Sequence, residues 1–392
     1  MASADIATQY GSIKGLGRHR VMAETNQDET ARLNYHMALH KHLREEVQSG
    51  NKMVYETRVE PAFLKANGRR PKDRHEVRKA MRRDPYYQWW ACMRRHIQEH
   101  GSQMKAPMIE RQIDDLVEKA RVPDPEFGSL RLDEALEAPR YQTALDMHWF
   151  AGSFGADYGE GDVFQAATYD LGGLYLSLGG KMGPFNDGPG RSVIYWLAEK
   201  HPEFEPRRVL DIGCTVGHST VAYADVWPDA EVHGIDFAAN LLRYGHARAE
   251  DLGAAVHYSQ QRAEETDFDE GSFDLVVSSM FLHETSYKAV HNIVREGFRL
   301  LKPGGLMLHV EQPPFRWFDE PFDQFVRDWD THNNNEPFWG PMHDMDLEEV
   351  AALGGFARQN VVQEMAQLIK PTETDRYAKA DGQWYVFAAW KH

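Results

Sequence analysis

The sequence predicts an α/β fold in which a mostly parallel sheet carries helices on both faces, preceded by an all-helical N-terminal domain. After Pro206, short apolar runs alternate with helical segments, which is typical of a parallel sheet. Residues 24–122 have helix-forming composition and little strand signal. Only an irregular loop separates the last two predicted strands, so we expect them to pair as an antiparallel hairpin at one edge.

Length and composition set the class of protein. The 392 residues leave room for two domains, and 42% of them are hydrophobic, as in a soluble globular protein. We find no apolar run long enough to span a membrane and no secretory signal core in the first twenty residues. The cysteines are Cys92 and Cys214, which favours a cytoplasmic protein with no disulfide framework and no cysteine-rich zinc site.

The net charge of −16 is spread unevenly, with +8 over residues 1–105 and −24 over residues 106–392. A basic segment can bind nucleic acid, but here acids are interleaved with the basic residues, as on a solvated helix face. We therefore expect no nucleic-acid partner and no membrane partner. The basic segment instead docks on the acidic part of the chain or on a second subunit, and we predict a homodimer.

Taken in order, the chain divides into three regions. Residues 1–20 are predicted to be a loose tail at the start of an N-terminal helical appendage, residues 1–122, that serves dimerisation or covers the active site. Residues 123–206 form a connecting and lid segment rich in glycine and aromatic residues, with a helix at about 191–200. Residues 207–392 form the ligand-binding α/β domain, with an insertion for substrate recognition at about 313–346.

The N-terminal region contains the aromatic stretch DPYYQWWACMRRHIQ. Its rings, Tyr86, Tyr87, Trp89 and Trp90, can form an aromatic core or a dimer contact, or they can form part of a substrate wall. The sequence favours the core or dimer contact.

In the α/β domain the predicted strands are 208–212, 231–235, 255–258, 273–278, 305–311, 360–365 and 384–390. Helices are predicted at about 217–226, 238–252, 286–301 and 346–353.

The first of these strands leads into the stretch RVLDIGCTVGHST, residues 208–220. A strand, a glycine-bounded turn and a helix start place backbone N–H groups and a carboxylate at the carboxyl end of a strand, where open α/β sheets bind ligands. Thr215 fills the slot in which a dinucleotide-binding turn needs a glycine close to the pyrophosphate. This argues against NAD and favours a nucleoside ligand without a pyrophosphate.

Four motifs in this order resemble the class I S-adenosylmethionine-dependent methyltransferases: VLDIGCTVG, VHGIDFAANLL, QRAEETDFDEGSFDLVVSSMFLHE and FRLLKPGGLMLHVEQ. The resemblance covers residues 169–392 and leaves the first 120 or so residues outside it. It implies a Rossmann-like seven-stranded sheet whose last strand is antiparallel. It also implies S-adenosyl-L-methionine as the cofactor.

The resemblance also implies how that cofactor is held. The carboxylate of Asp236 would accept both ribose hydroxyls, with capping of the next helix as its alternative role. Phe237 would cover the adenine. Arg262 stands where the family often has an acidic residue before the alanine, here Ala263, so adenine recognition falls to the backbone of Ala263 or to Glu264. The other predicted cofactor contacts are Asp211, Gly213, Cys214, Thr215, Gly217, Ser278 and Ser279.

His283 and Glu284 follow the fourth strand of the resemblance. Small-molecule O-methyltransferases often carry a His and an acid here, and in several of them the imidazole removes the proton of the substrate hydroxyl. The same pattern occurs in quinone-biosynthesis C-methyltransferases. His283 is therefore either a base or a residue that orients the substrate.

Residues 313–346 are rich in aromatic and polar side chains that can enclose an apolar or aromatic acceptor. Packing within the protein is the alternative. A metal bound by His332, His343 and Asp344 would lack the spacing of a known zinc motif, so we predict no metal. We predict His332 as a catalytic residue beside His283 and Glu284. The predicted substrate contacts are Tyr169, Tyr175, Trp317, Phe338, Trp339 and His343.

The sequence thus predicts an S-adenosylmethionine-dependent methyltransferase that acts on a small apolar or aromatic molecule, by O-methylation with His283 as base. The alternatives are a C-, N- or S-methyltransferase of a small metabolite, a non-methylating enzyme that binds the same cofactor, and a scaffold.

Overall fold

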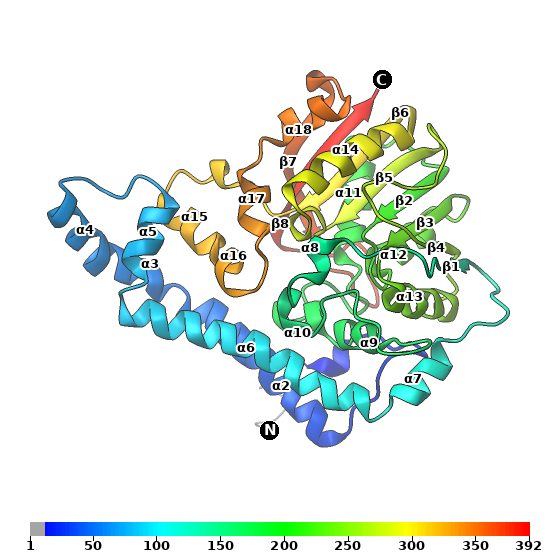
Figure 1. The fold of residues 1–392 in the computed structure, drawn as a ribbon, viewed down its shortest axis with the longest axis horizontal. Helices are drawn as coiled ribbons and strands as arrows, with labels where there is room; N and C mark the ends of the chain where they lie inside the picture. The colour runs from blue at the N-terminus through cyan, green and yellow to red at the C-terminus, as the bar shows by residue number, and fades with distance from the viewer. Residues whose placement is uncertain (1–11) are drawn as a thin grey trace.

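The structure is a computed structural model that describes residues 12–392, and Figure 1 shows its ribbon. Over these residues the chain forms an eight-stranded sheet with the order β1-β4-β3-β2-β5-β6-β8-β7. The strands are β1 (Ser129–Arg131), β2 (Arg208–Ile212), β3 (Glu231–Asp236), β4 (Val256–Gln260), β5 (Phe273–Ser279), β6 (Leu301–Glu311), β7 (Val361–Ile369) and β8 (Lys379–Lys391).

The pairing confirms the predicted fold class. From β1 to β6 all neighbouring strands are parallel, whereas β8 is antiparallel to both β6 and β7. The seven predicted strands are all present, and β2 has the predicted bounds. The strand β1 is an addition at the edge, parallel to β4, and its short sequence Ser-Leu-Arg has no apolar run that would predict a strand.

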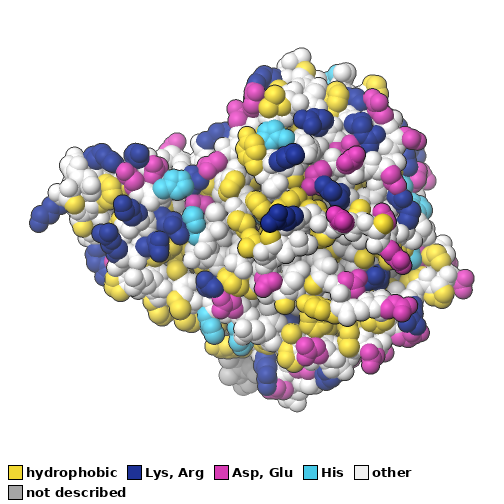
Figure 2. Space-filling view, in the orientation of Figure 1, with side chains coloured by type: hydrophobic (Ala, Val, Ile, Leu, Met, Phe, Trp, Pro, Cys, Tyr) yellow, Lys and Arg dark blue, Asp and Glu magenta, His cyan; other side chains and the backbone are white. Residues whose placement is uncertain are grey.

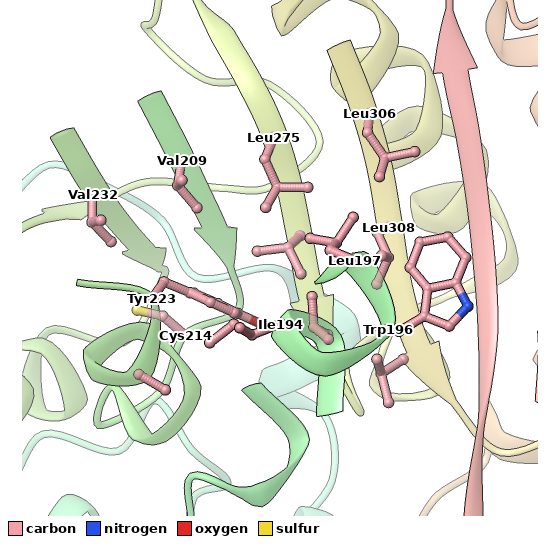
Figure 3. Close-up of a cluster of buried hydrophobic side chains, with 14 of the residues drawn as sticks. Ile194, Trp196, Leu197, Val209, Cys214, Tyr223, Val232, Leu275, Leu306 and Leu308 are labelled. Atoms are coloured by element: carbon pink, nitrogen blue, oxygen red, sulfur yellow. The ribbon is translucent and has the colours of Figure 1, made fainter. Parts of the chain in front are cut away.

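Helices cover both faces of the sheet. On one face lie α11 (Gly188–Lys200), α12 (His218–Val226) and α13 (Ala239–Asp251). Figure 3 shows Leu197 of α11 beside Leu308 of β6, in a cluster that also contains Ile194, Val209 and Leu275. On the other face lie α14 (Tyr287–Leu300) and α18 (Leu347–Gly354), followed by the short turn η7 (Arg358–Asn360). Because apolar strand residues face both ways, the sheet is buried on both sides.

The N-terminal region is helical, as predicted. Its helices are α2 (Gln27–His42), α3 (Gly50–Val54), α4 (Glu60–Asn67), α5 (Arg74–Met81), α6 (Pro85–Glu110) and α7 (Ile113–Ala120), with π-helical turns η2 (Leu43–Val47) and η3 (Tyr55–Val59). In Figure 1 the long helix α6 runs beside α2, from the projecting lobe of α4 and α5 to α7 near the sheet. Figure 2 shows Lys and Arg side chains gathered on this lobe.

The prediction of a loose tail is wrong for residues 12–20, whereas residues 1–11 lie outside the described residues. The turn η1 (Ile13–Gly15) begins a segment in which Ile13 and Leu16 are buried. Nε2 of His19 donates to Oδ2 of Asp170 at 2.8 Å, and both side chains are buried. This segment is therefore part of the packed structure.

The connecting segment, which is rich in glycine, contains several short helices. They are α8 (Arg140–Thr143), η4 (Met147–Trp149), α9 (Phe164–Asp170) and α10 (Gly173–Leu178). Gly172 (φ +92°) and Gly179 (φ +63°) flank α10 in the left-handed conformation that glycine adopts without strain. The boundaries at residues 122 and 206 between the proposed regions stay predictions.

After β6 comes the segment predicted to be an insertion for substrate recognition, and that role stays a prediction. It contains η6 (Phe315–Trp317), α15 (Pro321–Arg327), α16 (Trp329–Asn333) and α17 (Trp339–Asp344). Tyr87 and Trp90 of α6 pack against Phe325 and Trp329, with ring centroids 5.2 Å and 5.9 Å apart. Tyr87 and Trp90 thus form a core with the insertion, and none of the four rings of the aromatic stretch lines the cavity described below.

Among the described residues, none of the helices has the length and apolar character needed to cross a membrane.

Candidate active site

The loop after β2 has the backbone of a tight ligand-binding turn. Gly213 (φ +65°), Thr215 (φ +50°) and Gly217 (φ +77°) all have positive φ. A Cβ atom at Gly213 would lie 2.2 Å from Phe281, so this position needs a glycine for space as well as for its backbone conformation. Thr215 is a β-branched residue in the left-handed region, which is strained.

Thr215 keeps this conformation through its contact with Asp236. The Thr215 N–H donates to Oδ2 of Asp236 at 3.1 Å, and the Ala238 N–H donates to Oδ1 at 3.0 Å. Asp236 is buried at the end of β3, and burial raises its pKa to about 6 against the effect of these backbone hydrogen bonds. Each carboxylate oxygen accepts one backbone hydrogen bond and keeps lone-pair capacity for a further donor.

A cavity of about 370 Å³ lies beside this loop at the carboxyl ends of β2, β3 and β5. Many of the predicted site residues line it together. They are Tyr169, Asp211, Gly213, Cys214, Thr215, Asp236, Phe237, Arg262, Ala263, Ser279, His283, Glu284 and Trp339.

Phe237, Ala263, Glu264 and Tyr141 also line this cavity. The Tyr141 hydroxyl donates to Oε1 of Glu264 at 2.8 Å. Tyr141 belongs to α8, more than a hundred residues away in the sequence, and no local pattern marks it as a site residue. Burial raises the pKa of the Asp211 carboxyl to about 7 although it accepts a 2.6 Å hydrogen bond from Thr220.

A network of buried hydrogen bonds joins α9 to α12, which follows the loop after β2, and to α13. Asp170 accepts hydrogen bonds from Nε2 of His218 at 2.7 Å and from the Tyr244 hydroxyl at 2.7 Å, in addition to that from His19. The ring of Tyr169 stacks on His218 with centroids 5.6 Å apart. The network therefore holds Tyr169, a predicted substrate contact, in the cavity wall.

His283 lies in η5 (Leu282–Glu284), directly after β5, and its side chain is 3% exposed. Its Nδ1 donates to Oε2 of Glu311 at 2.6 Å, while Nε2 lies 3.5 Å from Oε1 of Glu284. Burial opposes the charged ring, but Glu311 and Glu284 together hold the pKa of His283 well above its ordinary value. The imidazole is thus oriented by one carboxylate and turned toward a second.

A second histidine, His148, is not predicted by the sequence. Its Nε2 donates to Oε1 of Glu284 at 2.6 Å, and its Nδ1 lies 3.1 Å from Oε1 of Glu336. The two carboxylates raise the pKa of His148 well above its ordinary value although burial opposes the charge. His148 and Trp149 both have positive φ, at +50° and +63°, a strained backbone of the kind found at functional sites.

The N-terminal helices supply another part of the wall. His36 and His40 of α2 and Lys105 of α6 line the cavity. Lys105 is 4% exposed, and none of the carboxylates in residues 12–392 forms an ion pair with it. Burial lowers its pKa to about 8, and burial also lowers the pKa of His36 to about 3.

Several predicted residues do not line the cavity, and secondary structure explains why. Ser278 and Ser279 are neighbours on β5, so their side chains point to opposite faces. Ser279 lines the cavity, while Ser278 shares a 2.7 Å hydrogen bond with His309. Asp330 of α16 and Asn334, the residue directly after this helix, both line the cavity. His332 lies on another side of this helix, with Nε2 3.5 Å from Asp328, so we remove it from the catalytic residues.

Four other predicted site residues also lie outside the cavity wall. Tyr175 donates to the Ser12 carbonyl at 3.2 Å. Trp317 is exposed and packs edge-on against Tyr385, and Phe338 packs behind Tyr141. Gly217 is required by the turn, because a Cβ atom there would lie 2.0 Å from the Tyr258 hydroxyl.

His343 forms a second layer. Its ring lies 4.5 Å from Trp339 and 6.4 Å from His283, and its Nδ1 donates to the Trp339 carbonyl at 2.7 Å. The substrate contacts that the structure supports by position are therefore Tyr169 and Trp339.

The residues present fit the nucleoside and amino acid parts of S-adenosylmethionine. The buried Asp236 carboxylate can accept from two vicinal hydroxyls, and Phe237 offers an aromatic face beside it. At another part of the cavity, both side-chain polar atoms of Asn186 and Nδ1 of His218 are buried without a hydrogen-bond partner. Such groups are costly to bury unless a ligand satisfies them.

Comparison with known proteins gives the family. The sequence profile described as "Methyltransferase domain" matches residues 209–305. An uncharacterised methyltransferase of Synechocystis is 31% identical over 40% of this chain and 70% of its own length. A demethylmenaquinone methyltransferase of Lactococcus lactis is 30% identical over 36% of this chain and 54% of its own length. The chain thus spans about half the length of several of the relatives it matches.

Among solved structures, phosphoethanolamine N-methyltransferase 2 of Haemonchus contortus aligns at 21% identity over 50% of this chain and 52% of that chain, with a TM-score of 0.36. The assignment rests on the matched domain, the Synechocystis relative and the geometry of the loop after β2. The chain belongs to the class I S-adenosylmethionine-dependent methyltransferases.

Proposed function

We propose that this protein transfers a methyl group from S-adenosylmethionine to a hydroxyl group of a small, apolar or aromatic molecule. The observation that carries the proposal is the shared cavity, in which Asp236 and the loop after β2 lie on the same wall as His283. The rings of Phe150, Phe154, Phe281 and Trp339 also line this cavity. Such walls bind apolar or aromatic ligands.

Different residues bind the cofactor, hold the acceptor and remove its proton. Asp236, Gly213 and Thr215 bind and orient the cofactor, which when bound supplies an electrophilic methyl group on a sulfonium sulfur. The aromatic walls hold the acceptor oxygen in line with that methyl group and exclude water. The new O–C bond forms as the C–S bond breaks, and the electron pair of the C–S bond stays on sulfur. The proton of the hydroxyl passes to Nε2 of His283.

Glu311 makes His283 suited to this role, since the hydrogen bond to Nδ1 leaves Nε2 as the atom turned away from β6. The raised pKa of His283 also determines the pH above which the imidazole is neutral and can act as a base. The neutral ring that accepts a proton prevails only above that pKa, so we expect the rate to rise with pH as His283 loses its proton.

The test is turnover with S-adenosylmethionine and a panel of phenols and aliphatic alcohols, with mass spectrometry of both products. We expect S-adenosylhomocysteine to form together with an O-methylated acceptor. His283→Gln should lower kcat and leave the affinity for S-adenosylhomocysteine close to that of the wild type. Nearly full activity of the His283→Gln variant would remove His283 as the base, and formation of no methylated product would remove the function.

A carbon acceptor is the second candidate. The Lactococcus lactis relative, at 30% identity, is a demethylmenaquinone methyltransferase by name, and the aromatic cavity wall would also accept an aromatic ring. Adding quinols to the panel and locating the new methyl group by NMR distinguishes an O-methyl from a C-methyl product.

We also propose that the N-terminal helices, besides covering the cavity, form the predicted homodimer in the cytoplasm. Large apolar side chains are exposed on these helices. They are Tyr35, Met53, Leu64 and Trp89. Light scattering coupled to size exclusion should give a dimer for the wild type and a monomer for Trp89→Glu if this surface is the interface.

A further inference from the structure

Three segments far apart in the sequence bring a histidine and two carboxylates together in the cavity wall. His148 comes from η4, Glu284 from η5, and Glu336 from the loop between α16 and α17. One ligand atom from each of the three lies within 4.8 Å of the others. The set differs from His332, His343 and Asp344, for which the sequence predicts no metal.

Several oxygen atoms of this cluster have no donor. Oε2 of Glu284, Oε2 of Glu336 and Oδ1 of Asn334 are buried without a hydrogen-bond partner. Glu336 is 2% exposed and Asn334 is 4% exposed, and both line the cavity. Burying such acceptors unpaired is unfavourable, and most strongly so for a carboxylate. These three oxygen atoms therefore lack a positively charged or donating partner among the described residues.

In the part of the chain that the structure describes, the positive charge paired with these two glutamates comes from histidines alone. Within residues 12–392, neither Glu284 nor Glu336 forms an ion pair with a lysine or an arginine. Their charged partners are the histidines, and Glu336 Oε1 also accepts a hydrogen bond from Nδ2 of Asn334. Asp330, another carboxylate that lines the cavity, is paired with Arg94 at 2.9 Å. A proton on His148 satisfies the Oε1 atoms of the two glutamates but leaves both Oε2 atoms and the Asn334 oxygen without a partner.

We propose that His148, Glu284 and Glu336 bind a divalent metal cation in the cavity. One imidazole nitrogen with two carboxylates is a donor set that suits Zn²⁺ and Mn²⁺. Three protein ligands leave coordination positions open toward the cavity, as in catalytic rather than structural metal sites. Asn334 supports Glu336 through Nδ2, which donates to Oε1 of Glu336, and its unpartnered Oδ1 is placed to add a ligand.

The binding of the cation goes beyond methyl transfer and does not depend on it. The role that we give the bound cation in catalysis does rest on the proposed function. Glu284 lies 3.5 Å from Nε2 of His283, so a cation held by Glu284 is next to the proposed base. An acceptor hydroxyl bound to the open positions would be oriented there and made more acidic.

The experiment uses the full chain after removal of metals with a chelator. Zn²⁺ and Mn²⁺ are added separately, excess ion is removed by desalting, and bound Zn²⁺ is measured by mass spectrometry of the elements and bound Mn²⁺ by electron paramagnetic resonance. We expect about one ion per chain, as for a mononuclear site. Glu336→Gln and His148→Gln should each weaken binding by about 100-fold, since each removes a ligand.

Glu264→Gln is the matched control, because Glu264 is another cavity-lining carboxylate but bonds to Tyr141. This variant should bind the ions as the wild type does. Circular dichroism and the melting temperature show whether each variant is folded. The proposal is overturned if the wild type retains neither ion after incubation at millimolar concentration. It is also overturned if folded Glu336→Gln and His148→Gln variants bind the ions as the wild type does.

Calorimetry with S-adenosylhomocysteine on the same samples separates the two claims. Metal binding without nucleoside binding leaves the cation site standing and contradicts the proposed function. Binding of S-adenosylhomocysteine without binding of a metal contradicts the cation site alone. The unpartnered oxygens of Glu284, Glu336 and Asn334 would then accept from a donor group of the substrate.

Discussion

Glu311, at the end of β6, accepts a 2.6 Å hydrogen bond from Nδ1 of His283, which follows the neighbouring strand β5. Glu311 is fully buried and also accepts from the backbone N–H groups of Phe281 and Leu282 at 2.9 Å and 2.6 Å. These bonds fix the carboxylate, which in turn fixes the imidazole. The orientation of the proposed base is therefore set by the sheet itself.

Glu311→Gln should move the pH dependence of methyl transfer. The Glu311 carboxylate is the first of the groups that raise the pKa of His283, and an amide removes its charge but keeps an acceptor. The pKa of His283 then falls, and the neutral base is available at lower pH. The rising limb of the kcat/KM profile should shift to lower pH. The control Glu364→Gln alters a carboxylate that bonds to Trp196, and an equal shift there would contradict this account.

Gly213→Ala should abolish binding of S-adenosylmethionine and destabilise the fold. The added methyl group meets Phe281 at 2.2 Å and the residue must keep φ +65°. Gly68→Ala is the control, because Gly68 has φ +70° and open space around it, so it loses only about 1 kcal/mol for the backbone. Urea unfolding and calorimetry measure the two effects. Equal losses of stability would show that the contact with Phe281 is unimportant.

Arg94→Met should destabilise the contact between α6 and the insertion. Arg94 binds both oxygens of Asp330, at 2.9 Å and 3.1 Å, and stacks on Trp329 at 4.0 Å. Losing the guanidinium leaves Asp330 unpaired, but Arg94 is partly exposed, so we expect a loss of roughly 2 kcal/mol in the free energy of unfolding. Adding Asp330→Asn should recover part of it. A double-mutant cycle without coupling contradicts the pairing.

Lys105→Met should stabilise the protein near neutral pH. Burial lowers the pKa of Lys105 from 10.5 to about 8, which corresponds to roughly 3 kcal/mol for carrying the charge in the fold. Between these two pKa values the folded chain binds fewer protons than the unfolded chain, so wild-type stability rises with pH there. The advantage of the variant should shrink over this range in denaturant unfolding. A variant less stable than wild type throughout would contradict this.

The sequence predicts the sheet well because its strands are local apolar runs between glycine turns. The bounds of β2 and the positions of α11 to α14 follow from residues close together in the chain. The same holds for the loop with Gly213 and for Asp236, which form the cofactor part of the cavity. The three residues of β1 form a strand only because β4 offers them a free edge.

The acceptor side of the cavity could not be predicted in this way. His148, Lys105 and Glu336 come together through packing of α6, η4 and the insertion, and each is an ordinary polar residue in its own segment. The wrong predictions arise from side-chain direction. His332 and Trp317 lie in the right segment, but the helix face or the turn directs them away from the cavity.

Calorimetric titration with S-adenosylmethionine tests the central claim most directly. The wild type should bind it, and Asp236→Asn should bind it about 100-fold more weakly, because the variant loses a charge-assisted acceptor of two hydroxyls. The control Asp267→Asn, in a surface ion pair with Arg131, should bind like the wild type. Absence of binding to the wild type, or equal affinity of a folded Asp236→Asn variant, would contradict the account.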